Sequence, residues 1–284
     1  MKRESFGSRL GFILVSAGCA IGIGNVWKFP YICGAYGGAA FILIYLCFLV
    51  ILGIPVLVAE FAVGRGSHTS VAKCFDKLAP AGSCWKPLKF IGIIGCYMLM
   101  MFYTTVGGWM IYYCVKSLRG DFVGATPEAV TQSFSDMLGN APTMMLWMVI
   151  ICLIGFAVCF MGLQNGIEKI SKVMMSALLI IMVILAVHSV MMEGAGEGIS
   201  FYLIPDFQKI KEAGVGNVVF AALSQSFFTL SIGIGAMLIF GSYLDKSRSL
   251  TGEAVSITVL DTFVALTAGF IIRSEEHTSE LQSL

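Results

Sequence analysis

A long apolar stretch of this chain is interrupted by glycines where a membrane-spanning helix would otherwise continue. Gly18, Gly22 and Gly24 crowd the centre of the segment 16–30, and each glycine costs a helix about 1 kcal/mol relative to alanine. The pattern returns as Ile-Gly-Ile-Gly at 232–235. A helix broken inside a bilayer leaves peptide groups that only protein or a water-filled cavity can satisfy. Paired interruptions of this kind are typical of binding sites in membrane proteins built from inverted repeats.

Composition indicates a polytopic membrane protein. Of the 284 residues, 57% are hydrophobic, against roughly half in soluble proteins. Since about 20 apolar residues cross a bilayer, we expect an all-α protein that has the lipid bilayer as a partner. The net charge of +1 gives no reason to expect a nucleic-acid partner. Seven runs are long enough to span: 9–34, 39–64, 88–117, 142–162, 168–192, 216–243 and 251–272.

The placement of lysine and arginine predicts a cytoplasmic N-terminus. With that orientation, twelve basic residues lie on the inner side and four on the outer side, which agrees with the positive-inside rule. The inner set is Lys2, Arg3, Arg9, Arg65, Lys73, Lys77, Lys86, Lys89, Lys169, Lys172, Lys246 and Arg248, and the outer set is Lys116, Arg119, Lys209 and Lys211.

Two ionisable residues near the ends of apolar runs are candidates for function, because such side chains are costly in a bilayer. Glu60 lies towards the end of the run 39–64. Its carboxylate either accepts hydrogen bonds from amides exposed by the broken helices, or it reaches the interface or pairs with Arg65. Lys28 follows the first interruption. It either closes an outer path with an opposite charge or extends its side chain to the interface.

Asp261 stands in the middle of the last apolar run, in Val-Leu-Asp-Thr-Phe, with no lysine or arginine in that run. A bound cation is the economical partner, because hard cations prefer carboxylate, amide and carbonyl oxygens. Asn25, Thr229 and the carbonyls freed by the breaks would complete an oxygen cage. The alternative is a protonated Asp261 that is hydrogen-bonded to a neighbouring helix. Tyr103 offers a hydroxyl group in the run 88–117, where it is either a site residue or a core side chain.

Several motifs occur together over residues 5–272, and in them the chain resembles the neurotransmitter:sodium symporter family, in particular its bacterial amino-acid transporters. The motifs are Arg9-Leu-Gly-Phe-Ile-Leu14 with Gly18–Pro30, Gly37-Gly-Ala-Ala-Phe41, Gly53–Arg65, Gln164-Asn-Gly-Ile-Glu-Lys-Ile170, Tyr202-Leu-Ile-Pro-Asp206 and Gln225-Ser-Phe-Phe-Thr-Leu-Ser231.

The resemblance implies an inverted-repeat, leucine-transporter-like fold. Residues 1–192 would form the first five-helix repeat, with its first helix unwound near 19–24. Residues 193–272 would hold an outer loop and two helices of the second repeat, the first of these unwound near 229–235. Family members have eleven or twelve helices, so we expect a C-terminal truncation. The polar segment 273–284 resembles a translated sequencing adapter, and we expect it to be non-native.

The resemblance also implies site residues. The first sodium site would use the Ala20 carbonyl, Asn25, Thr229, Asp261 and the substrate carboxylate, and the second the carbonyls of Gly18 and Ile21. The substrate would contact the amides of Ile23 and Gly24 and the Tyr103 hydroxyl, with Leu99, Phe228, Ser231 and Ile234 around its side chain. Lys28 and Gln225 would form an outer gate with Phe228 as its lid.

These features predict sodium-coupled symport of a neutral, hydrophobic L-amino acid across the inner membrane of a bacterium by alternating access, without enzymatic chemistry. We expect the truncated chain itself to be inactive. Gly22 replaces the aspartate of monoamine carriers, which favours amino acids. Asp261 replaces the asparagine of many animal members, so chloride is not expected. The alternatives are a proton-coupled carrier or exchanger, a channel, or a membrane-embedded enzyme. The sequence makes no prediction of the oligomeric state.

Overall fold

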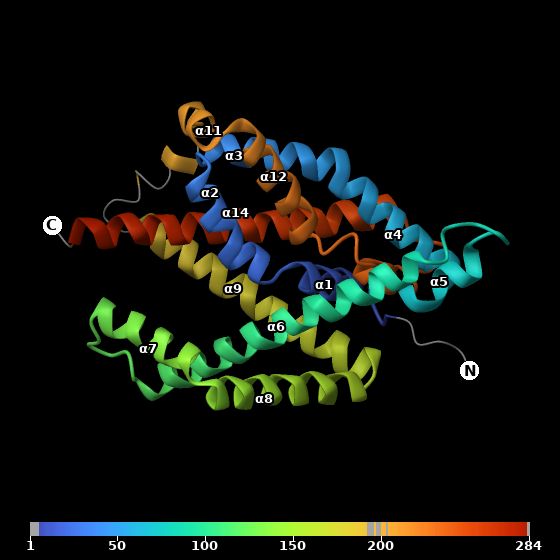
Figure 1. Cartoon of the computed structure of the whole chain (residues 1–284), viewed down its shortest axis with the longest axis horizontal. Coiled ribbons are helices and arrows are strands. Elements are labelled where there is room, and N and C mark those ends of the chain that lie inside the picture. The colour runs from blue at the N-terminus through green and yellow to red at the C-terminus, as the bar shows by residue number, and fades with distance from the viewer. Residues whose placement is uncertain (1–5, 192–195, 197–199, 203, 283–284) are drawn as a thin grey trace.

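The computed structural model describes residues 6–191, 196, 200–202 and 204–282, and these residues form helices and no strands (Figure 1). Three short π-helical segments, η1 to η3, interrupt or precede α-helices. The first part of the chain contains α1 (Arg9–Ala20), η1 (Gly24–Lys28), α2 (Phe29–Ala35), α3 (Ala39–Phe48), η2 (Leu49–Gly53), α4 (Ile54–Ser67), α5 (Val71–Leu78) and α6 (Leu88–Arg119). The second part contains α7 (Pro127–Gly139), α8 (Ala141–Phe160), η3 (Leu163–Glu168), α9 (Lys169–Met191), α11 (Phe207–Ala213), α12 (Val215–Thr229), α13 (Ala236–Gly241) and α14 (Leu250–Gln282).

The all-α fold class is therefore confirmed. Of the described helices, five are long and apolar enough to cross a membrane, and six if the bent pair Arg9–Ala20 and Gly24–Ala35 counts as one span. The expected span 216–243, for which an unwound segment near 229–235 was expected, consists of the short helices α12 and α13 on the two sides of residues 230–235. The start of the expected outer loop, 193–195 and 197–199, lies outside the described residues.

The long helix α14 runs through the middle of the fold (Figure 1) and contacts α1, η1, α2, α4 and α9. Its contact face is made of small or branched apolar side chains, among them Ala254, Ile257, Val264, Ala265 and Ala268, all of which are buried. Small residues let helices approach closely inside a membrane, where packing replaces the hydrophobic driving force. The backbone of 273–282 continues α14. That this segment is non-native stays a prediction.

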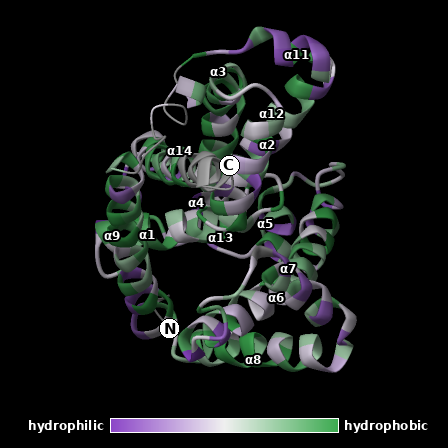
Figure 2. Cartoon of the chain, turned by 90° about the vertical axis from the view of Figure 1, so that its left-hand side faces the viewer, coloured by the Kyte–Doolittle hydropathy of each residue, from purple (hydrophilic) through white to green (hydrophobic). Residues whose placement is uncertain are grey.

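Helices α6 and α8 form an antiparallel hairpin beside this core (Figure 1). The two backbones meet at Gly108, where a Cβ atom would lie 2.9 Å from the backbone nitrogen of Met148. Helix α8 buries none of its residues, and most of its surface is hydrophobic in Figure 2. An apolar, unburied helix surface suits contact with lipid. The hydrophilic residues gather instead on segments such as α11 (Figure 2).

Candidate functional site

The first interruption separates α1 from η1 and α2. Helix α1 ends at Ala20, and Ile21 adopts an extended conformation. The helices on the two sides of the break differ in direction by 55°. The amide of Gly22 donates to Asn25 Oδ1 at 3.2 Å, which fixes the turn into the second half. Ile23 and Gly24 therefore lie at the start of a half-helix, where amides carry a positive partial charge.

The second interruption separates α12 from α13 over residues 230–235. Ser231, Gly233 and Gly235 have φ angles of 52°, 92° and 79°, in the left-handed region that glycine adopts most easily. The hydroxyl of Ser231 donates to the carbonyl of Cys19, 3.2 Å away at the end of α1. The two interruptions, far apart in sequence, are therefore in contact.

Asn25, Thr229 and Asp261 meet beside these interruptions, and all three are fully buried. Asn25 Nδ2 lies 2.8 Å from Asp261 Oδ1, 3.2 Å from the Asp261 carbonyl and 3.0 Å from Thr229 Oγ1. Thr229 Oγ1 in turn donates to Asp261 Oδ2 at 2.8 Å. Three oxygen atoms thus surround the amide nitrogen of Asn25 in the core.

The chemistry of this cluster fits a hard cation. Carboxylate, hydroxyl and carbonyl oxygens are the donors that such ions prefer, and no lysine or arginine among the described residues forms an ion pair with Asp261. Asn25 turns its amide nitrogen, rather than its oxygen, towards the oxygens of Thr229 and Asp261. The structure therefore brings three of the expected sodium ligands, Asn25, Thr229 and Asp261, together.

The remaining expected ion ligands lie around the end of α1. Ala20 and Ile21 are buried, and the Ile21 amide donates to the Ala17 carbonyl at 2.6 Å. Gly18 packs against α9, since a Cβ atom there would lie 3.2 Å from the side chain of Met175. Of the two residues of the second expected site, Ile21 is therefore buried and Gly18 is half-buried against α9.

The expected substrate residues approach the interruptions from two helices. A Cβ atom on Gly22 would lie 3.9 Å from the Tyr103 hydroxyl, and one on Gly24 would lie 2.9 Å from the Phe228 ring. Leu99, half-buried on α6, is one turn from Tyr103, and residues four apart share a helix face. The carbonyl of Ile234, in the second interruption, lies 3.5 Å from Sγ of Cys96, which is also on α6. Helix α6 therefore faces both interruptions.

The expected gate residues also lie together. Lys28 Nζ stands 4.1 Å from the centroid of the Phe228 ring, and Gln225 Nε2 donates to the Gly24 carbonyl at 2.9 Å. Lys28 and Phe228, with Ile23 and Phe102, line a cavity of about 410 Å³. Phe228 thus contacts Gly24 at the first break and also lines this cavity.

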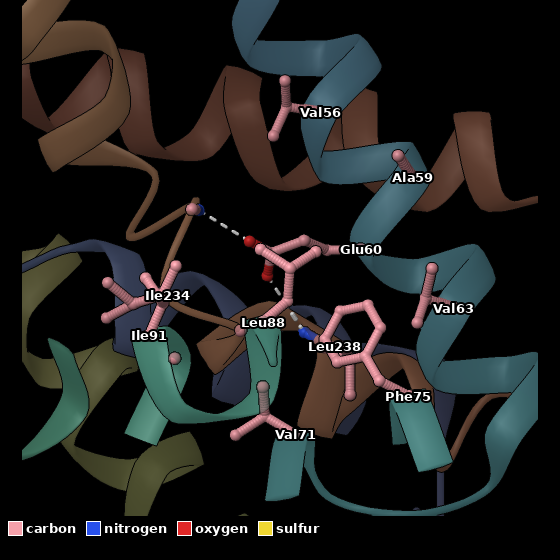
Figure 3. A pocket seen from close by; sticks show the side chains of 13 residues that line it. Val56, Ala59, Glu60, Val63, Val71, Phe75, Leu88, Ile91, Ile234 and Leu238 are labelled. Carbon is pink, nitrogen blue, oxygen red and sulfur yellow. Dashed lines mark hydrogen bonds between the residues drawn. The ribbon is translucent and has the colours of Figure 1, made fainter. Parts of the chain in front are cut away.

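Glu60 connects α4 to the second interruption (Figure 3). Its carboxylate accepts hydrogen bonds from the amides of Gly233 at 2.6 Å and Leu238 at 3.2 Å. Arg65 instead donates to the Arg248 carbonyl at 2.8 Å. Of the alternatives open for Glu60, the contact with exposed amides is therefore the one that the structure shows.

Two further buried carboxylates hold the start of α1, and the sequence analysis did not single them out. Glu168 accepts from the Gly7 amide at 2.9 Å and from Lys172 Nζ at 2.6 Å. Glu253 pairs with Arg9 at 3.0 Å. Both acidic residues fall near the beginning of an apolar run, and this position in the sequence could have indicated them as buried carboxylates.

Comparison with known proteins identifies this architecture. The family model described as the sodium:neurotransmitter symporter family matches residues 3–129 and 128–275. The chain belongs to the sodium:neurotransmitter symporter family. The predicted resemblance is thus confirmed, and the family and fold are those of transporters, not of enzymes.

Two members of the sodium:neurotransmitter symporter family illustrate the similarity. The sodium-dependent transporter YhdH of Bacillus subtilis (strain 168) is 35% identical over 271 residues, which cover 95% of this chain and 59% of the relative. A sodium-dependent transporter of Haemophilus influenzae is 32% identical, over 95% of this chain and 60% of the relative. The chain thus spans about 60% of the length of these relatives.

A solved structure from this comparison is the crystal structure of MhsT in complex with L-phenylalanine. It shares 38% identity with the chain and superimposes with a TM-score of 0.87, over 96% of this chain and 61% of MhsT. The predicted leucine-transporter-like fold is therefore confirmed.

Proposed function

We propose that this chain provides the amino-acid site and the first sodium site of a sodium-coupled symporter for a neutral, hydrophobic L-amino acid. The protein would act by alternating access in the inner membrane of a bacterium, with its N-terminus in the cytoplasm. One observation carries the proposal: the buried Asp261 carboxylate meets Asn25 and Thr229 where the two broken helices touch. A buried charge is costly unless a partner compensates it, and a sodium ion is the partner that this donor set favours.

In this proposal, sodium contributes positive charge beside two carboxylates, that of Asp261 and that of the substrate. Asn25, Thr229 and Asp261, with the Ala20 carbonyl, would hold the first ion, and the Gly18 and Ile21 carbonyls would contribute to a second. Because the substrate would complete the first site, each ligand raises the affinity for the other by the same factor. Binding of the two is therefore coupled.

The substrate class follows from the groups around the interruptions. The amides of Ile23 and Gly24 begin a half-helix, and such ends bind anionic groups. We assign them, with the Tyr103 hydroxyl, to the substrate carboxylate. Leu99, Phe228, Ser231 and Ile234 would surround the side chain and favour a hydrophobic one. The L-phenylalanine bound in MhsT, at 38% identity, supports the same class.

The outer gate and the absence of a chloride requirement belong to the same proposal. Phe228 lies against Gly24 on one side and beneath Lys28 on the other, so it would cover a bound amino acid, with Gln225 fixing the Gly24 carbonyl. The fixed negative charge of Asp261 next to the sodium ligands would do what a bound anion does in other members. Transport would therefore proceed without chloride.

The experiment that tests the function is amino-acid binding at constant pH and ionic strength. A version of the chain extended to the length of its relatives is placed in nanodiscs, and radiolabelled L-phenylalanine is titrated in sodium or in potassium buffer. We expect saturable binding in sodium alone. Equal binding in both buffers contradicts the proposal, and binding that follows pH but ignores sodium favours a proton-coupled carrier.

A further inference from the structure

A second cavity lies on the other side of the second interruption from the outer gate. It has a volume of about 230 Å³ and is lined by residues of α4, α5, α6 and the segment that leads from Gly233 into α13 (Figure 3). Of the residues that line it, only Ile234 belongs to the proposed substrate pocket. This inner cavity is therefore a separate feature of the fold.

The walls of the inner cavity are apolar, and a single charge faces it. Val56 and Val63 come from α4, Phe75 from α5 and Ile91 from α6. Glu60 is the one charged residue among those that line the cavity, and Figure 3 shows its side chain reaching into the space between these helices. A ligand here would meet hydrocarbon on most sides and a carboxylate at one point.

The contacts of Glu60 with the second interruption are made by backbone amides, which carry no net charge. Its two oxygens accept hydrogen bonds from the amides of Gly233 and Leu238, and the amides of Gly235 and Met237 also interact with the carboxylate. No lysine or arginine in the described part of the chain forms an ion pair with Glu60. A negative charge in apolar surroundings is costly without a charged partner. The inner cavity therefore favours a cation that carries N–H donors and disfavours anions.

We propose that the inner cavity binds a primary ammonium ion that carries a short hydrocarbon chain, with the ammonium group on Glu60 and the hydrocarbon among Val56, Val63, Phe75 and Ile91. An apolar cavity of about 150 Å³ already admits benzene, so six carbon atoms fit the larger volume. An amino acid is excluded, because its own carboxylate would lie beside Glu60. The occupant contacts α4, α5, α6 and the second interruption at once, and it holds them in this arrangement.

A series of probes on the unmodified chain tests this site without requiring transport or sodium. The chain is placed in nanodiscs of zwitterionic lipid, and radiolabelled n-hexylammonium, n-hexanol and n-hexanoate are equilibrated by dialysis against loaded and empty nanodiscs. We expect saturable binding of n-hexylammonium, at least 10-fold tighter than that of n-hexanol, and no binding of n-hexanoate above the empty nanodiscs. Equal affinities for the ammonium ion and the alcohol, or no saturable binding, overturn the proposal.

Variants then locate the site. Glu60→Gln keeps the shape of the side chain and removes its charge, so the 10-fold preference for n-hexylammonium over n-hexanol should disappear. Ala59→Phe places a ring at the cavity wall and should weaken both probes. Glu128→Gln, on the exposed helix α7, is the matched control and should change neither affinity. A preference that survives in Glu60→Gln overturns the assignment, and the result on the unmodified chain stands even if one variant does not fold.

Discussion

The amide nitrogen of Asn25 lies 2.8 Å from Oδ1 of Asp261, although 236 residues separate the two in sequence. Asn25 is in the segment after the first interruption, and Asp261 is at the middle of α14. The contact therefore joins the first helix of one proposed repeat to the second helix of the other. Any ligand that changes the position of Asn25 acts directly on α14.

Removing the charge of Asp261 should change the ion requirement of the extended protein. In Asp261→Asn the carboxylamide keeps two polar atoms in place but loses the fixed negative charge, so sodium-dependent uptake should come to require chloride. In Asp261→Ala the oxygens are absent, and sodium-dependent binding should fall at least 100-fold. The measurement is uptake of radiolabelled L-phenylalanine with chloride or gluconate. Uptake by Asp261→Asn that is equal in both anions contradicts the proposed role.

Adding a methyl group at Gly24 should weaken amino-acid binding. A Cβ atom at this position would lie 2.9 Å from the Phe228 ring, which is closer than ordinary van der Waals contact, so the ring must move from the amides of the first interruption. We expect Gly24→Ala to raise the dissociation constant for the amino acid at least 10-fold. Gly155→Ala, in α8, is the control, because a Cβ atom there meets nothing within 4 Å. Comparable affinities in the two variants contradict the proposed pocket.

A methyl group at Gly11 should destabilise the start of α1. A Cβ atom at Gly11 would overlap the carboxylate of Glu168, which must then leave the Gly7 amide and Lys172. Losing hydrogen bonds to a buried charged group costs about 1.5–3 kcal/mol, so Gly11→Ala should lower the thermal unfolding midpoint. Gly7→Ala adds the same methyl group at 3.6 Å from the same carboxylate and should change the midpoint little. Equal midpoints would show that Glu168 does not hold α1.

The sequence predicted those parts of the fold and site that depend on local chemistry. Glycines in an apolar run indicate a break because the cost of glycine in a helix is a local property. Asp261 indicates a partner because a charge in an apolar run needs one wherever the chain folds. The Ile-Gly-Ile-Gly sequence at 232–235 indicated the break inside the run 216–243, but it did not indicate that Ser231, which is not a glycine, also has a positive φ angle.

Contacts between distant residues were only partly predictable from the sequence. The meeting of Asn25, Thr229 and Asp261 was expected from the two breaks and the lone charge of Asp261, and the resemblance implied the same set, although no spacing rule relates Asn25 to residues more than 200 positions away. The pairing of Glu168 with Gly7, across 161 residues, had no such guide. Glu168 forms a local pair with Lys172, four residues away, and by itself that pair is typical of an ordinary helix surface.

Lys28 should control how fast a bound amino acid leaves towards the outside. Its ammonium group lies 4.1 Å from the centroid of the Phe228 ring, and a cation in this position stabilises the ring by about 0.5–1 kcal/mol at an exposed site. Lys28→Met removes the charge and keeps the length of the side chain, so dissociation of radiolabelled L-phenylalanine from the extended protein should become about 2–5-fold faster. Lys28→Arg retains a cation that stacks on aromatic rings and should leave the rate unchanged or lower it. Lys73→Met, on the exposed face of α5, is the control for a general loss of positive charge. If L-phenylalanine dissociates from Lys28→Met and from Lys73→Met at the same rate, Phe228 closes the site without help from Lys28.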